Sequence, residues 1–589
     1  MSGFNLSINS GPQDSLLYDP TRSYFTNVGY VRTSNFAMEL RDVDPQNTAM
    51  LGSTVQFVIP KAADLLGPVD LMLEFNQSNS STGANSYAAW VEAVGLAMIE
   101  RIQFSIGSHD IETLTGEHLA IMNELMKSDE QRLGYKQILK TGDSAVKYDI
   151  NEVQSGSAGA KDVGASASGN VVQGDVKNGR LICSTDQAGT ATHYPGKKLI
   201  VPLGLFFTKH PSQYFPLCAI AGANDVRISI KLRSLNDLLV LSATDYPVDD
   251  TNKQIINAAL DASTAAGVSA PTFTSSSAIK SGTCKLRCHY VHVTGPEATS
   301  IMNKEHVRLL RQWSSVPKTV TLPGSAPSYV GAAAGVAGGT RAFGLKTGSD
   351  ALGAEFTVDM DLSFLHPISE LIITIRKTTD MGSSTTAIVP TGTANKGATE
   401  KNYFAYHGGG ADPNIESIHN KTRSATSGDS GVEAGFAESF LRVDSFKLTL
   451  NGQDRHPSLA ADGIDRDYLM ERLMPMLHSN TSTAFTEAAD TYGGVASGAA
   501  ESVAASADLK QLAQKLDRKE IYVYPFAINP EGANPSGAVN FSKVSHAKLQ
   551  IKGRSFSTTG VDQEYVVDVY GINYNWLQIK DGRGLISFA

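Results

Sequence analysis

The side chains that could bind a metal ion show no spacing typical of a metal site in this sequence. Asp462, Asp465 and Asp467 lie close together, but they lack the ligand run of an EF-hand, so we interpret them as the solvated start of a helix. His289 and His292 lie three residues apart on a predicted strand and therefore point to opposite faces. They cannot bind one ion together, and we expect no metal and no cofactor.

The residues that could act as nucleophiles also lack a catalytic setting. The four cysteines are Cys183, Cys218, Cys284 and Cys288, and they show no zinc-site spacing. Cys284 and Cys288 share one face of a predicted strand but lie about 13 Å apart at ~3.3 Å per residue, too far for a disulfide. A reducing, cytosolic folding compartment is the simplest interpretation. HExxH, nucleophile-elbow and P-loop motifs are absent, so we expect no catalytic residue and no enzyme.

Composition narrows the class of protein. The chain has 589 residues, 53 of them glycine, and only 19% are charged, which favours two large all-β domains with long polar turns. It has no apolar run long enough to span a membrane, and its first residues do not resemble a signal peptide. The net charge is −9 and the 50 basic residues are dispersed; the densest group, 306–311, reads as an amphipathic connector. We therefore expect no direct binding of nucleic acid.

One stretch near the C-terminus, 521–552, shows how the strands are organised. Residues 521–526 are β-branched and aromatic, as in a strand, and a turn rich in proline, asparagine and glycine follows. In that turn Pro535 cannot donate to a ladder, and Gly537 can adopt a positive φ. Residues 544–552 then alternate apolar with polar side chains, which predicts a second strand.

The first half of the chain contains a degraded copy of this pattern. Residues 205–232 repeat it, with 224–231 aligned on 545–552. Two more pairs of segments keep the same order, 68–75 with 367–375 and 102–107 with 446–452, and each copy of the second pair leads into a helix-like run, 117–127 or 465–477. Three echoes in order predict one all-β module present twice.

The pattern predicts about eight strands in each half. The expected strands of the first half are 31–40, 54–59, 69–75, 98–106, 110–114, 198–206, 225–232 and 284–293. Those of the second half are 317–322, 355–362, 368–377, 440–450, 453–456, 519–527, 543–552 and 563–580. Long loops are expected at 77–88, 140–196, 235–282, 323–354, 378–438, 479–510 and 553–562. In a jelly roll alternate loops leave at one end, so these insertions gather at one end of each roll.

These residues resemble a known family, the double jelly-roll major capsid proteins of nucleocytoplasmic large DNA viruses. The similarity covers most of the chain outside the loops and is most specific near the C-terminus. The residues that carry it are Gly11-Pro12-Gln13-Asp14, Phe25, Arg32, Thr33-Ser34-Asn35-Phe36-Ala37, Asn123-Glu124-Leu125, His366-Pro367, Leu450-Asn451-Gly452, Tyr522-Val523-Tyr524-Pro525-Phe526-Ala527, Pro530-Glu531, Pro535-Ser536-Gly537, Asn540-Phe541-Ser542 and Tyr570-Gly571-Ile572-Asn573-Tyr574-Asn575.

The resemblance implies an all-β fold of two consecutive eight-stranded antiparallel jelly rolls with long loops and a few short helices. The expected division is an N-terminal arm 1–24, a first roll 25–296, a connector 297–315 and a second roll 316–589. It implies a homotrimeric capsomer of near-hexagonal outline that tiles an icosahedral shell in the virion. The implied partners are neighbouring capsomers, minor capsid and penton proteins, and an inner viral membrane nearby, with assembly in the host cytoplasm.

Several alternatives remain open at this point. The chain could be a minor capsid or spike protein of the same fold, or a jelly-roll carbohydrate-binding protein, although only three tryptophans are present for an aromatic platform. Family members often carry glycans on outer loops, and sequons occur at Asn5, Asn76, Asn79, Asn420, Asn480 and Asn540. A cytosolic chain does not meet the glycosyltransferase of the secretory pathway, so we interpret most of these as chance and Asn540 as structural.

Overall fold

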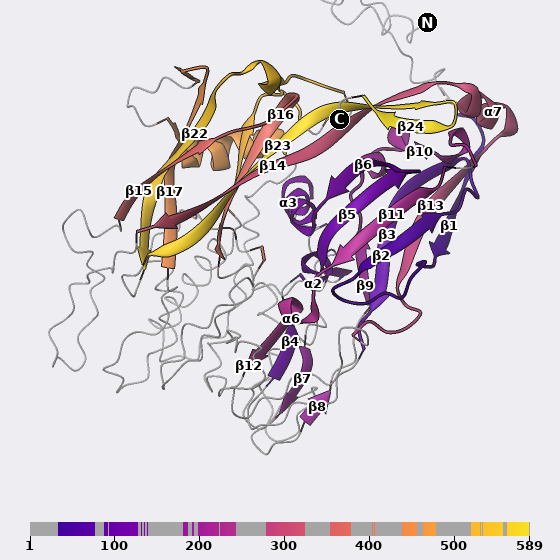
Figure 1. Cartoon of the computed structure of the whole chain (residues 1–589), viewed down its shortest axis with the longest axis horizontal. Helices are drawn as coiled ribbons and strands as arrows, with labels where there is room; N and C mark the ends of the chain where they lie inside the picture. Colours follow the sequence, from indigo (N-terminus) through magenta and orange to yellow (C-terminus); the bar gives the residue numbers. More distant parts are fainter. Residues whose placement is uncertain are drawn as a thin grey trace, which may run out of the picture.

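Antiparallel sheets dominate the secondary structure of the described residues in the computed structural model of this chain (Figure 1). The structure describes residues 33–76, 87–91, 93–127, 131, 135, 138–139, 181–185, 191–193, 198–222, 224–242, 278–323, 354–378, 403–404, 406, 439–455, 463–478, 520–530, 532, 534–557 and 562–587. The predicted arm 1–24 and most of the predicted loops lie outside these residues.

The first half folds into two facing sheets. One sheet has the order β1-β13-β3, with β9 and β10 both paired to β3; the other has the order β2-β11-β5-β6. Their bounds are β1 Phe36–Val43, β13 Lys285–Val293, β3 Leu65–Glu74, β9 Lys198–Pro202, β10 Phe215–Pro216, β2 Thr54–Ile59, β11 Val226–Leu232, β5 Ile99–Ile106 and β6 His109–Leu114.

The second half repeats this arrangement strand for strand. One sheet has the order β14-β23-β16, with β20 and β21 both paired to β16; the other has the order β15-β22-β17-β18. Their bounds are β14 His306–Leu322, β23 Gln563–Lys580, β16 Pro367–Lys377, β20 Ile521–Pro525, β21 Val539–Asn540, β15 Ala354–Asp361, β22 Ala547–Ser557, β17 Ser439–Leu450 and β18 Gln453–Asp454. Two short strands extend it, β19 Ile464–Asp465 beside β17 and β24 Arg583–Ile586 beside β23. The predicted double jelly roll is confirmed.

The register of the strands confirms the internal repeat residue by residue. Ile228 of β11 lies opposite Phe104 of β5, and Leu549 of β22 lies opposite Leu448 of β17. These are the residues that the sequence echoes align. Burial explains why the echoes survive, because alternate residues along these strands face the core of each roll.

Short helices lie between the strands of both rolls. Their bounds are α2 Val94–Ala97, α3 Gly116–Met126, α6 Leu235–Leu238, α7 Gly295–Asn303, the π-helix η8 Tyr468–Leu473, α9 Met474–Leu477, and the 3-10 turns η3 Phe206–Thr208, η4 Pro211–Gln213, η5 Leu217–Ala219 and η9 Phe541–Lys543. The helix-like runs predicted after the fifth strand of each half, 117–127 and 465–477, are both present. In Figure 1 α3 lies between the two rolls.

Two predictions about connecting segments were wrong. Residues 306–311 form no amphipathic connector, because β14 begins at His306 and pairs with β23 along its whole length. The predicted loops 77–88, 140–196 and 235–282 contain the strands β4 Tyr87–Trp90, β7 Leu181–Thr185, β8 Ala191–His193 and β12 Leu239–Ser242, which form a further sheet of order β12-β4-β7-β8. That sheet brings three insertions together at one end of the first roll, as the jelly-roll topology predicts (Figure 1).

The turn that follows β20 depends on Gly537, which has a φ of 141°. A Cβ atom at this position would lie 2.9 Å from the carbonyl oxygen of Phe526, so a side chain strains both the backbone and its neighbour. We expect Gly537→Val to lower the free energy of unfolding by about 1–3 kcal/mol, measured by thermal and urea denaturation. Gly222→Val is the control, because a Cβ there meets nothing within 4 Å. Equal melting temperatures for wild type and Gly537→Val would show that the turn does not need glycine.

Candidate functional site

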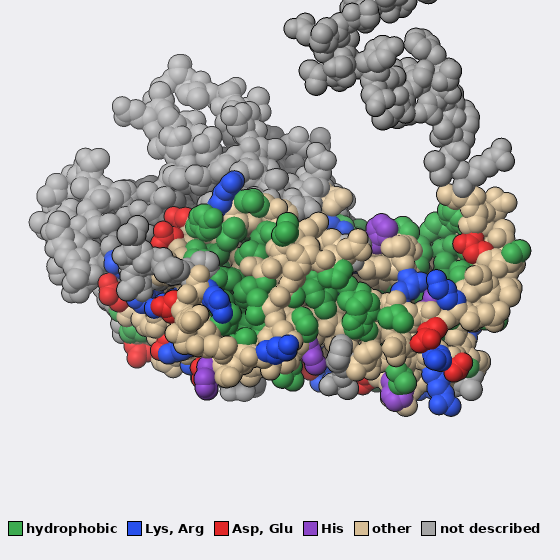
Figure 2. Space-filling model, turned by 90° about the horizontal axis from the view of Figure 1, so that it is seen from above, with side chains coloured by type: hydrophobic (Ala, Val, Ile, Leu, Met, Phe, Trp, Pro, Cys, Tyr) green, Lys and Arg blue, Asp and Glu red, His purple; other side chains and the backbone are tan. Residues whose placement is uncertain are grey.

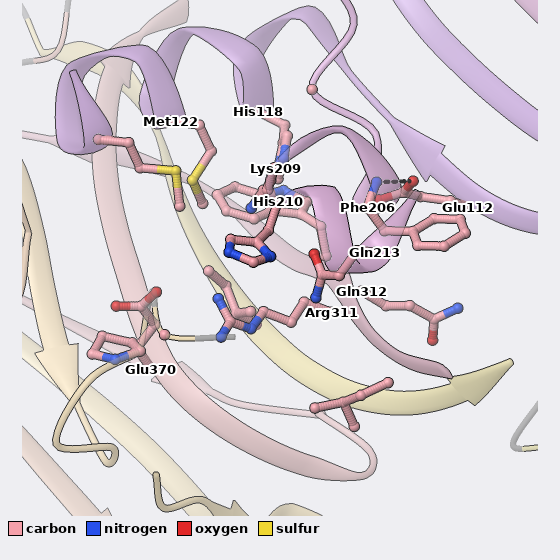
Figure 3. Close-up of a pocket in the computed structure, with 17 residues that line it drawn as sticks. Glu112, His118, Met122, Phe206, Lys209, His210, Gln213, Arg311, Gln312 and Glu370 are labelled. Carbon is pink, nitrogen blue, oxygen red and sulfur yellow. Dashed lines mark hydrogen bonds between the residues drawn. The ribbon is translucent and has the colours of Figure 1, made fainter. Parts of the chain in front are cut away.

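The described residues form a seam between the two rolls, with a cavity of about 160 Å³ lined by polar and apolar side chains. Its wall combines α3 and residues 203–213 of the first roll with β14 and β23 of the second (Figure 3). The residues that line it are Glu112, His118, Met122, Met126, Gly204, Phe206, Lys209, His210, Gln213, Leu309, Arg311, Gln312, Trp313, Glu370, Pro530, Gly532 and Ile572.

Helix α3 is placed in the seam by its first turn. The Thr115 side chain caps the helix by accepting a hydrogen bond from the backbone N–H of His118 at 3.2 Å, as the sequence predicts. Gly116 lets the helix approach α2 closely, since a Cβ there would lie 2.2 Å from the Leu96 carbonyl oxygen. One face of the helix then presents His118, Met122 and Met126 to the second roll.

Burial shifts the pKa values of two titratable groups of the seam in opposite directions. Burial raises the pKa of Glu112 to about 7, although its carboxylate accepts a hydrogen bond from the Phe206 N–H at 3.0 Å. Burial lowers the pKa of His118 to about 3, and its neutral ring packs edge-on against Trp313 with ring centroids 4.1 Å apart. A histidine that acts as a general base needs an accessible ring with a pKa near neutral pH. His118 is buried and neutral, so it serves as an aromatic contact.

A buried ion cluster joins the rolls beside this contact. The guanidinium of Arg376 on β16 lies 2.7 Å from the Glu117 carboxylate of α3 and 2.6 Å from the Asp568 carboxylate of β23. Burial raises the pKa of Glu117, while the positive charge of Arg376 opposes that rise. Because all three side chains are largely excluded from water, each charge depends on the others for compensation.

A second set of contacts fixes the rolls to each other at the opposite end from the inserted sheet. The N–H of Ala221 and the side-chain amide of Asn224 both donate to the carbonyl oxygen of Gly582, at 3.0 and 2.8 Å. Gly582 has a φ of 76°, and a Cβ there would meet Ala221 at 2.4 Å. The β23–β24 turn of the second roll is thereby seated on the first.

The candidate metal ligands considered above are not brought together. Asp467 pairs with Arg466 at 2.6 Å, Asp465 belongs to β19, and Asp462 lies outside the described residues. His289 and His292 lie beside different carboxylates, Asp70 at 3.8 Å and Glu39 at 3.0 Å. Within the described part of the chain no group of three or more histidine, cysteine or acidic side chains is placed to hold a metal ion.

The cysteine and sequon predictions fall partly within the described residues. Cys218, Cys284 and Cys288 are free thiols, and burial raises the pKa of Cys284 and Cys288 to about 12, so neither is a reactive thiolate. Asn540 is structural, as predicted, because its side chain accepts a hydrogen bond from the Ser542 N–H at 3.1 Å and starts η9. Of the other sequons only Asn76 is described, and its backbone N–H donates to Ala278.

Sequence reasoning did not single out the residues that join the rolls. Arg376, Glu117 and Asp568 lie far apart in the sequence, and none has a neighbour that signals an ion pair. Charged residues within apolar strands were the available signal, since Arg376 lies within a run of buried residues in β16. As for membranes, no described helix combines the length and the apolar character that a bilayer span requires.

Comparison with known proteins agrees with this fold. A family model described as major capsid protein N-terminus matches residues 23–272, and one described as large eukaryotic DNA virus major capsid protein matches residues 510–584. The major capsid protein of Phaeocystis pouchetii virus is 25% identical, and that of Chrysochromulina ericina virus is 22% identical. Each of these alignments covers 98% of both chains.

Solved structures give the same fold. The chain is similar to a quasi-atomic model of the PBCV-1 virus capsid, with a TM-score of 0.53, 15% identity, and coverage of 96% of this chain and 100% of that chain. It is also similar to the Faustovirus major capsid protein, with a TM-score of 0.52, 12% identity, and coverage of 97% and 95%. With the repeated strand order and the two family matches, these findings place the chain among the double jelly-roll major capsid proteins of the nucleocytoplasmic large DNA viruses.

Proposed function

We propose that three copies of this chain form a capsomer of near-hexagonal outline, and that such capsomers tile the icosahedral shell of a large double-stranded DNA virus. The observation that carries the proposal is the identical strand order of the two rolls. Three chains bring six similar rolls into a ring, so a trimer presents six similar sides to its neighbours in the shell. A hexagonal tile needs that geometry, and a chain with a single roll would need six copies to provide it.

The two ends of the molecule suit different surroundings. The inserted sheet β12-β4-β7-β8 lies at one end, and β14, β23 and β24 cross the other end (Figure 1). Seen from above, hydrophobic side chains gather over the middle of that second end (Figure 2), and Val307, Trp576 and Leu585 are exposed on these strands. We assign this end to the inside of the shell, where minor capsid and penton proteins and an inner membrane are the expected neighbours.

The opposite end, with the inserted sheet, then faces outward, and any glycans would be attached to its loops. In this proposal the protein has a structural role in the virion, assembles in the host cytoplasm, catalyses no reaction and does not bind nucleic acid directly. The acidic net charge of −9 supports the last point, because a shell protein that coated the genome would need a basic face.

The test is the mass of the recombinant protein in solution. Light scattering at micromolar concentration and neutral pH is expected to give three times the 62.7 kDa of one chain. Electron microscopy of the same sample is expected to show flat particles of hexagonal outline. A soluble, folded protein that stays monomeric over this concentration range would contradict the proposal.

A further inference from the structure

The first roll carries an apolar stripe on an edge strand. Phe36, Met38 and Leu40 of β1 are 59%, 56% and 60% exposed. They lie on the outer face of the sheet, because the alternate residues Glu39 and Val43 pair with the buried Tyr290 and Leu286 of β13. In Figure 1 β1 lies at the end of the first roll that is farthest from the second roll. Three large apolar side chains in one exposed row on an edge strand favour a partner.

The second roll has an equivalent outer face on its edge strand, and there it is partly covered. The strand equivalent to β1 is β14, because each is the edge strand beside β13 or β23 in the same strand order. When Asp70 is aligned with Glu370, the residues that match Met38, Leu40 and Asp42 on the outer face of β14 are Leu309, Arg311 and Trp313, all partly buried. These residues line the seam opposite α3 (Figure 3). Within one chain, therefore, the helix of the first roll covers the outer face of the second roll.

The second roll has an equivalent helix, which packs on β20 of its own roll and leaves its other face exposed within the described part of the chain. Leu114 before α3 pairs with Ile102, and Ile464 before η8 pairs with Phe446, at equivalent positions of β5 and β17. Equal numbers of residues counted from Leu114 and from Ile464 give the equivalent positions on the two helices. They are His118 and Tyr468, Met122 and Arg472, and Met126 and Met476. The first three face the seam; Tyr468 is 53% exposed, Met476 is 63% exposed, and Arg472 is also exposed.

We propose that the helix 468–477 of one copy covers the stripe Phe36, Met38 and Leu40 of the next copy, which repeats between chains the joint that α3 and β14 make within a chain. The inference rests on the proposed trimer and names its interface. Each chain then offers one helix and one stripe, so the contact is head-to-tail and must close into a ring. The ring of six rolls then has six joints of the same geometry. Three of them lie within a chain and three lie between chains.

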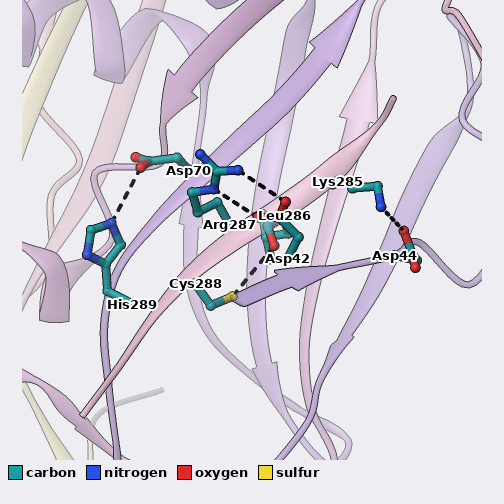
Figure 4. A network of polar contacts seen from close by, with 8 residues as sticks. All are labelled: Asp42, Asp44, Asp70, Lys285, Leu286, Arg287, Cys288 and His289. Carbon is teal, nitrogen blue, oxygen red and sulfur yellow. Dashed lines mark hydrogen bonds and ion pairs between the residues drawn. The ribbon is translucent and has the colours of Figure 1, made fainter. Parts of the chain in front are cut away.

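Polar groups around the stripe fit this partner. On the same outer face Asp42 pairs with Arg287 at 2.8 Å, and His289 lies 3.8 Å from Asp70 (Figure 4). A carboxylate can accept further hydrogen bonds while it is paired. The exposed Arg472, in the middle of the helix stripe, brings a positive charge to this acidic border. The order of groups is therefore complementary as well as apolar.

The joint between chains lacks the ion cluster of the joint within a chain. The pairing of β3 with β9 can be aligned with the pairing of β16 with β20. In this alignment Asn76 occupies the position equivalent to Arg376. Asp568 lies opposite Thr374 in the second roll. The equivalent neighbour of Glu74 in the first roll is Thr283, which is uncharged. No counterpart of the Arg376 cluster has to be buried when two chains meet, so apart from the contact of Arg472 with the border the joint between chains is apolar. A contact of this kind carries a smaller desolvation penalty than the buried ion cluster within the chain.

Two double variants test the inference. Met38→Glu/Leu40→Glu removes the stripe, and Tyr468→Glu/Met476→Glu removes the helix surface; each is expected to give folded monomers by light scattering and circular dichroism. The control is Ile528→Glu, an 85% exposed side chain outside both surfaces, which should leave the trimer intact. A mixture of the two double variants should give dimers and no trimers, because only one good helix–stripe contact is then available.

A cross-linking experiment covers the case in which the glutamate variants fail to fold. Leu40→Cys/Tyr468→Cys treated with a short bis-maleimide should yield covalent trimers, and each single cysteine variant should give only the background of the native thiols. If wild type is trimeric but both glutamate variants remain trimeric and no trimer cross-links, the interface lies elsewhere and the stripe serves another partner. If wild type itself is monomeric, the proposed capsomer is wrong and this inference falls with it.

Discussion

Replacing Arg376 with methionine is expected to lower the free energy of unfolding by about 3–5 kcal/mol, because the carboxylates of Glu117 and Asp568 then remain buried without a cation. The loss should be concentrated at the joint between the rolls. Urea denaturation is therefore expected to change from one transition into two, as the rolls unfold separately. The measurement is the unfolding curve at pH 7.5, followed by tyrosine and tryptophan fluorescence and by circular dichroism.

The matched control is Arg227→Met on β11. Arg227 also pairs with an aspartate, Asp225 at 3.0 Å, but both side chains are nearly half exposed, so the change should cost less than about 1 kcal/mol. The triple variant Arg376→Met/Glu117→Gln/Asp568→Asn should recover much of the loss, since no unpaired charge is left. Similar stabilities for Arg376→Met and Arg227→Met would show that the cluster does not hold the rolls together.

The second large effect is a pH dependence at Glu112. The folded state raises the pKa of this carboxyl from 4.5 to about 7, so the native protein keeps a proton that the unfolded chain releases. The contribution of Glu112 to stability therefore falls as pH rises from 4.5 to 7 and is constant above that range. Its size is about 3 kcal/mol, at roughly 1.4 kcal/mol per pKa unit.

Glu112→Gln should remove this dependence. Glutamine can still accept the hydrogen bond from the Phe206 N–H, and it carries no charge. The variant should match wild type near pH 4.5 and exceed its stability by up to about 3 kcal/mol at pH 8, measured by urea denaturation across the pH series. Glu355→Gln, at a side chain that is 81% exposed, is the control. A stability difference between Glu112→Gln and wild type that stays constant from pH 4.5 to 8 would show that Glu112 does not titrate there.

Sequence reasoning predicted the strands of both rolls because each strand keeps a period of two against its own core. The strand 54–59 was predicted with its observed bounds, and the aligned pairs 224–231 and 545–552 occupy equivalent strands. The turns were predicted from residue types, since Gly537 needs its positive φ and Thr115 caps α3. Local chemistry determines all of these features.

Features that depend on distant partners were not predicted. The strands β4, β7 and β12 are short and lie in polar loops, and they form a sheet because topology brings three insertions together. Residues 306–311 have a helical pattern of charge, yet pairing with β23 makes them a strand. The ion cluster of Arg376 and the exposed stripe of β1 likewise emerge only when segments far apart in the chain are placed side by side.

The pairing of β14 with β23 has a consequence for the order in which the protein is made. Residues 306–322 leave the ribosome well before residues 563–580, on the order of tens of seconds earlier at common rates of synthesis. During that interval β14 is a 17-residue strand without its partner, an open template for pairing with other nascent chains. This strand is therefore the segment that a holding chaperone would need to cover during synthesis.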